Sequence, residues 1–97
     1  MNFIRLYPVY LRAQAYLEAR QGGLAATEFQ KIIDHFGLVA NEPIGSLANL
    51  GLGRAYAIAG DSTKARTAYQ DFFALWKDAD LDVPILKQAK AEYAKLE

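Results

Sequence analysis

The chain has 97 residues, of which 53% are hydrophobic and 23% charged, and its 11 basic and 11 acidic residues give a formal net charge of zero. This length allows one small domain with a real core, and the balanced charge offers no electrostatic footprint for nucleic acid or for an anionic membrane. The absence of cysteine excludes disulfides and thiolate chemistry and is compatible with a cytoplasmic location, which we expect.

The first predicted pair of helices spans about residues 3–36, with an interruption at Gln21-Gly22-Gly23. Arg5, Pro8 and Arg12 interrupt the apolar N-terminal run, so it forms neither a signal-peptide core nor a membrane span of about 20 residues. We therefore expect no targeting segment and no membrane contact.

The next predicted pair spans about residues 44–77 and folds back on itself at Gly60-Asp61. Gly60 supplies the positive-φ position that closes a helix, and Asp61 or Ser62 offers an oxygen to the free N–H groups of the next helix. Pro43 precedes the pair, in keeping with the preference of proline for the first turn of a helix.

A fifth helix is predicted over about residues 84–96, where apolar side chains recur beside lysines. A stack of hairpins has to cover the apolar face of its last member, and a single helix with a polar outer side does so. We expect Trp76 to pack beneath this capping helix.

The loop before the fifth helix carries Asp78, Asp80 and Asp82, which alternate as they do at the start of a calcium loop. Val83 stands where the glycine of the sharp turn should be, and Ala89 where the bidentate glutamate should be. We predict a solvated acidic loop, with no metal site and no cofactor.

The two pairs of helices are related by a constant offset of 40 residues. The matches are Ala15-Tyr16 with Ala55-Tyr56, Ala25 with Ala65, and Phe29-Gln30 with Tyr69-Gln70. A constant offset across both helices indicates a duplicated helical hairpin. We predict an all-α fold of about five helices in a single domain, with repeat one over about 3–36, repeat two over about 44–77 and the capping helix over about 84–96.

The spacing within each hairpin resembles the tetratricopeptide repeat. In the second hairpin, the family's Leu-Gly pair, tyrosine, interhelix turn, small residue and second aromatic residue correspond in that order to Leu52-Gly53, Tyr56, Gly60-Asp61, Ala65 and Tyr69. The first hairpin is a degenerate copy, with Arg12 where leucine is expected and Ala13 for the glycine. The 40-residue period exceeds the family's period of about 34, so the superhelical pitch does not carry over.

The whole chain also looks like the C-terminal region of certain bacterial eukaryotic-like serine/threonine protein kinases that end in such repeats. The stretches that carry this resemblance most are LYPVYLRAQAYL, GLVANEPIG and FALWKDADLDVPILKQAKAEYAKL. The chain contains no Gly-rich loop, no His-Arg-Asp loop and no Asp-Phe-Gly, so it holds no kinase chemistry of its own. The resemblance implies an interaction or regulatory segment of a signalling protein.

By resemblance, the first helix of each repeat lines a concave groove that binds a protein or peptide ligand. The positions concerned are Tyr7, Tyr10, Gln14, Leu17, Leu47, Leu50, Arg54 and Ala57. The Lys and Asn set that the family uses for a terminal carboxylate is missing, so an apolar or aromatic-bearing helix or extended peptide suits the groove better. An alternative of equal weight is that Tyr7 and Tyr10 bind no ligand and only pack against preceding repeats of a longer chain.

Two other functions compete with the binding of a peptide in the groove. The exposed N-terminal face of the first hairpin could pair with its copy in a homodimer, because an open stack leaves an apolar end. A small enzyme has the least support, because His35 is the sole histidine and no cysteine exists to form a catalytic or metal-binding pair with it.

Overall fold

The computed structural model describes residues 2–36, 43–79 and 83–96, and the side-chain surroundings of residues 8–34, 45–75 and 84–96. The described residues form the helices α1 (Asn2–Glu18), α2 (Gly22–Phe36), α3 (Pro43–Ala59), α4 (Ser62–Ala79) and α5 (Val83–Ala94). No strand occurs in these ranges, so the predicted all-α class with about five helices is confirmed.

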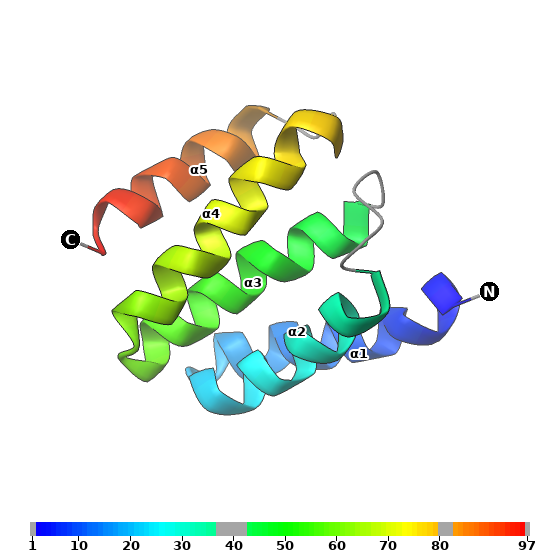
Figure 1. Ribbon diagram of the computed structural model, residues 1–97. Helices are drawn as coiled ribbons and strands as arrows, with labels where there is room; N and C mark the ends of the chain where they lie inside the picture. Colours follow the sequence, from blue (N-terminus) through cyan, green and yellow to red (C-terminus); the bar gives the residue numbers. More distant parts are fainter. Residues whose placement is uncertain (1, 37–42, 80–82, 97) are drawn as a thin grey trace.

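The helices follow one another across the molecule in chain order, from α1 and α2 at one end to α5 at the other (Figure 1). Each helix packs on the next one along the chain, and α1 also packs on α3. The first and second hairpins, α1–α2 and α3–α4, therefore lie side by side, and α5 covers the free side of α4.

The turn of the second hairpin is closed by backbone and side-chain hydrogen bonds. Gly60 has a φ of 87°, and the N–H of Asp61 donates to the carbonyl oxygen of Tyr56 at 2.9 Å. The Oδ1 atom of Asp61 accepts a hydrogen bond from the N–H of Lys64 at 3.1 Å. The predicted left-handed glycine is confirmed, and of the two residues predicted to cap the next helix, Asp61 accepts this hydrogen bond.

The first hairpin makes the same turn without a glycine. Arg20 lies 40 residues before Gly60 and has a φ of 63°, and the N–H of Gln21 donates to the carbonyl oxygen of Tyr16 at 2.9 Å. The left-handed residue of this turn therefore lies before the expected break at Gly22-Gly23. Because L-residues rarely adopt this conformation, the sequence pattern pointed to the glycines instead.

Glycine is needed where α2 and α3 approach each other. A Cβ atom at Gly22 would lie 2.8 Å from the backbone nitrogen of Ala59, and one at Gly51 would lie within 2.8 Å of three ring atoms of Phe29. The Phe29 ring is fully buried in this contact. Glycine thus lets the backbones of α2 and α3 approach each other at Gly22, and lets the Phe29 ring pack on the backbone of α3 at Gly51.

The core has two clusters. The first lies between the two hairpins and consists of Ala13, Ala25, Ala26, Phe29, Ile32, Ala48, Leu52, Ala55 and Ala68. The second lies between the second hairpin and α5 and consists of Leu50, Tyr69, Phe72 and Ala89. The alanines keep the helices close, and the aromatic rings fill the space that remains.

We predict opposite effects of glycine exchange at the two left-handed positions. Arg20→Gly should raise the free energy of unfolding by about 1 kcal/mol, because it removes the steric cost of a side chain at positive φ. Gly60→Ala should lower it by a similar amount, about 1 kcal/mol. Urea unfolding followed by circular dichroism measures both, and a loss of stability in Arg20→Gly would contradict the assignment.

A second pair of variants tests the contact between α2 and α3. Gly51→Ala should lower the free energy of unfolding by roughly 1–3 kcal/mol, because the added methyl group meets the Phe29 ring. Gly23→Ala is the matched control, since nothing lies within 4 Å of the added atom. The control should be neutral or gain up to about 1 kcal/mol from helix propensity, and equal losses in both variants would refute the packing argument.

Candidate ligand-binding groove

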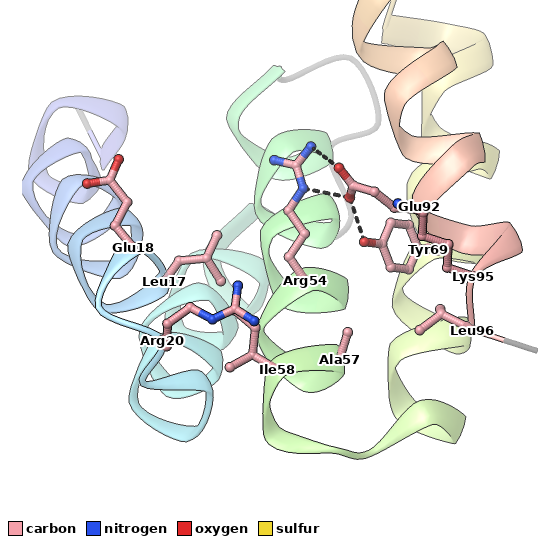
Figure 2. Close-up of a pocket in the computed structure, with 10 residues that line it drawn as sticks. All are labelled: Leu17, Glu18, Arg20, Arg54, Ala57, Ile58, Tyr69, Glu92, Lys95 and Leu96. Carbon is pink, nitrogen blue, oxygen red and sulfur yellow. Dashed lines mark hydrogen bonds and ion pairs between the residues drawn. The ribbon is translucent and has the colours of Figure 1, made fainter.

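A groove of ≈ 610 Å³ opens between the end of α1, the C-terminal half of α3 and the end of the chain (Figure 2). Figure 2 shows α3 between the other two walls, with the α1 side chains on one side and those of α4 and α5 on the other. The lining residues are Leu17, Glu18, Arg20, Arg54, Ala57, Ile58, Tyr69, Glu92, Lys95 and Leu96.

Three of the residues predicted for the groove lie together in it, namely Leu17, Arg54 and Ala57. Leu17 projects from α1, whereas Arg54 and Ala57 occupy one side of α3 at a spacing of one helical turn (Figure 2). The proximity of these positions follows from the packing of α1 on α3.

The other predicted positions do not line this groove. Tyr10 packs edge-on against Phe29 with 6.0 Å between ring centroids, and its hydroxyl accepts a hydrogen bond from Gln14 Nε2 at 2.9 Å. Leu50 is only 3% exposed and belongs to the second core cluster, beneath α5. Leu47 is partly buried outside the groove lining, and the side chain of Tyr7 lies outside the described residues.

A carboxylate from α5 is bound inside the groove by two groups of the second hairpin. Arg54 donates from Nε to Oε1 of Glu92 at 2.8 Å and from Nη2 to Oε2 at 3.0 Å. The hydroxyl of Tyr69 donates to Oε1 of the same carboxylate at 2.7 Å (Figure 2). A bidentate contact from Arg54 together with the hydrogen bond from Tyr69 holds the carboxylate in one orientation. This network therefore fixes α5 relative to α3.

Burial and charge act on the pKa values of this network in identifiable ways. Burial of the Tyr69 hydroxyl, followed by its hydrogen bond to the Glu92 carboxylate, raises the pKa of Tyr69. For Arg54, burial acts to lower the pKa, but the hydrogen bonds and the attraction of Glu92 outweigh it and raise the pKa. Both donors therefore keep their protons around neutral pH.

The rest of the groove combines apolar and charged side chains. Ile58 on α3 and Leu96 after α5 supply apolar surface, and Ala57 is exposed between them (Figure 2). Arg20 and Lys95 are exposed cations for which the described part of the chain offers no ion pair. The groove can therefore contact apolar side chains and still interact with polar or charged groups of a ligand.

Sequence reasoning missed the walls contributed by the turn after α1 and by α5. Arg54 and Glu92 have opposite charges but are 38 residues apart, and no local spacing brings them together. Arg20 lies in a turn that the sequence predicts at the glycines after it, because glycine is the usual left-handed residue. The repeat itself was a usable signal, since Arg20 aligns with Gly60 at the offset of 40.

Several other predictions lie outside the described side chains. These concern His35, Trp76, Asp78, Asp80 and Asp82. In the described residues, no three His, Asp or Glu side chains gather where they could hold a metal ion. No helix in the described ranges has the length and apolar run that crossing a membrane requires.

Comparison with known proteins finds no matching family model, no similar curated protein and no similar solved structure.

We predict that the Glu92 carboxylate holds α5 in place. Glu92→Gln should lower the free energy of unfolding by roughly 1–3 kcal/mol, because it leaves the guanidinium of Arg54 partly buried without its counter-charge. Amide hydrogen exchange should quicken in α5 more than in α3. Lys90→Gln, at an exposed position of the same helix, is the control and should change stability by less than about 0.5 kcal/mol; unchanged α5 exchange in Glu92→Gln would rule out this role.

Proposed function

We propose that the chain is a protein-interaction scaffold that binds a peptide or a helix in the groove between α1, α3 and α5. The observation that carries the proposal is the combination, on one concave surface, of apolar contacts at Leu17 and Ile58 with the cations Arg20 and Lys95. Binding sites for peptides typically combine apolar pockets with a few oriented polar groups.

The sequence resemblance supports the same class of function. Tetratricopeptide-like hairpins use the first helix of each repeat for recognition, and α1 and α3 are those helices here. A place in the C-terminal region of a serine/threonine protein kinase remains part of the proposal and rests on the three resembling stretches. Any phosphoryl transfer would belong to another domain, since no kinase motif occurs in this chain.

The groove proposal is tested with peptides selected from a random library on the immobilised chain. Selected peptides should shift the amide resonances of Leu17, Arg54 and Ala57 in the ¹⁵N-labelled protein. Ala57→Glu should weaken their binding at least tenfold, because it places a charge and added bulk in the exposed middle of the groove.

Thr67→Glu is the matched control, because Thr67 is exposed on α4 and is not among the residues that line the groove. It should leave the affinity of the selected peptides unchanged. Equal weakening by both variants, shifts confined to α2 and α4, or a failure to enrich any peptide would each argue against the groove as the recognition site.

A further inference from the structure

One side of α1 is exposed along its described length. The exposed residues follow the spacing of a helix and share this side, which we term the outer face of α1, and they are Pro8, Leu11, Arg12, Ala15, Glu18 and Ala19. The N–H of Ala19 donates to the carbonyl oxygen of Ala15 at 3.0 Å, so the helical pattern continues to the last of them. Leu11, Ala15 and Ala19 form an apolar stripe along the outer face, and Leu11 is 52% exposed.

Another hairpin of the same kind does not fit on the outer face of α1. At the offset of 40 residues, Leu11 corresponds to Gly51, which the second hairpin buries against the first. The Phe29 ring lies so close to Gly51 that a Cβ atom there would come within 2.8 Å of three ring atoms. A preceding hairpin packed in the same way would therefore place its ring on the Leu11 side chain. A partner of the outer face has to pack beside Leu11 and not over it.

The charged residues of the outer face lie at equal distances from Ala15. Arg12 lies three residues before Ala15, and Glu18 lies three residues after it. At about 100° per residue, their side chains project about 60° to either side of Ala15. The apolar stripe is thus centred on a small residue, with a cation on one flank toward one end and a carboxylate on the other flank toward the other end.

The Glu18 carboxylate is available to a partner. It is exposed, and no ion pair among the described residues involves it. Figure 2 shows this carboxylate directed away from α3, whereas the side chains of Leu17 and Arg20 extend toward α3. Glu18 therefore lies where the outer face of α1 meets the rim of the groove.

The Arg12 guanidinium can bind a second carboxylate. Its Nε and Nη2 atoms both donate to Oε1 of Glu28, at 2.9 Å and 2.6 Å, while Lys31 donates to Oε2 of Glu28 at 3.0 Å. A guanidinium has five N–H donors, of which these bonds to Glu28 use two. The Arg12 side chain is 51% exposed. The bonds to Glu28 thus hold the guanidinium in place and leave donors for a further partner.

We propose that the outer face of α1 binds a second copy of the chain, with the two α1 helices antiparallel about a two-fold axis at Ala15. Such an axis places each residue level with the residue of the other copy that is equally far from Ala15 on the opposite side. Leu11 then lies level with Ala19, and Arg12 lies level with Glu18, so that each contact occurs twice. The small side chain of Ala15 lets the two helices approach closely at the axis.

Leu24 adds apolar surface near the same axis. Its equivalent in the second hairpin is Lys64, whose Nζ atom lies 5.5 Å from the ring centroid of Tyr56. Tyr56 corresponds to Tyr16, the neighbour of Ala15, so Leu24 lies level with the axis. Leu24 is 51% exposed, and the two-fold contact brings the Leu24 side chains of the two copies toward each other.

The charges favour a second copy over a partner helix of one charge sign. A helix flanked only by carboxylates would place one of them near Glu18, and a helix flanked only by lysines would place one near Arg12. An antiparallel copy of α1 brings a carboxylate to Arg12 and a cation to Glu18. This contact is independent of peptide binding in the groove.

Sedimentation equilibrium of the full chain should show a dimer whose fraction rises with protein concentration. Glu18→Lys should weaken this dimer at least tenfold, because a lysine then faces Arg12 of the other copy. Added salt should weaken the wild-type dimer and strengthen the dimer of Glu18→Lys. Asp71→Lys makes the same change of charge at an exposed position of α4 and should leave the dimer unchanged, as should Ala57→Glu in the groove.

Because the chain has no cysteine, introduced cysteines report which residues meet at the axis. Oxidation should link Ala15→Cys to its own copy, and it should link Leu11→Cys to Ala19→Cys in a mixture of these two variants. Ala74→Cys, at an exposed position of α4, is the control and should stay unlinked.

A monomer at all concentrations would overturn the proposal, and so would equal weakening of the dimer by Glu18→Lys and Asp71→Lys. A parallel pair of helices would link Leu11→Cys to its own copy in preference to Ala19→Cys, which contradicts the antiparallel axis. A dimer that Ala57→Glu abolishes would place the contact in the groove and would overturn the proposal as well.

Discussion

Helices α2 and α3 approach each other more closely than ordinary side chains permit, and the positions of all the other elements depend on this contact. Gly22 leaves room for the backbone at Ala55 and Ala59, while Gly51 leaves room for the ring of Phe29. An aromatic side chain of one hairpin thus fills a gap in the next. This contact fixes the distance between the hairpins and, with it, the packing of α1 on α3.

The groove is a consequence of that spacing together with the anchoring of α5. Packing between the hairpins supplies two of its walls. The third wall depends on Glu92, which ties α5 to Arg54 and Tyr69 in addition to the apolar contacts around Ala89. The two ends of the molecule differ in the side chains that they expose. At one end α5 covers the second hairpin through apolar contacts, whereas the first hairpin presents cations and two exposed leucines at the other end.

Elements set by local chemistry could be predicted from the sequence. Gly60 and Asp61 specify their turn through neighbouring atoms, and the duplicated hairpin follows from matches at a constant offset. Leu50 shows the limit, since its helical position is compatible with a groove until α5 is placed over it. The pairing of Arg54 with Glu92 depends on the same placement. These features depend on contacts between distant segments, which periodicity does not encode.

The left-handed conformation of Arg20 sets two selective pressures against each other. A glycine would satisfy the backbone of this turn with less strain, as Gly60 does in the other hairpin, but it would remove a cation from the wall of the groove. Selection for stability alone should therefore replace this residue, whereas selection for the proposed ligand binding should keep it. Such opposition between stability and activity is a common property of functional positions, and directed evolution of this chain under the two regimes should diverge first at residue 20.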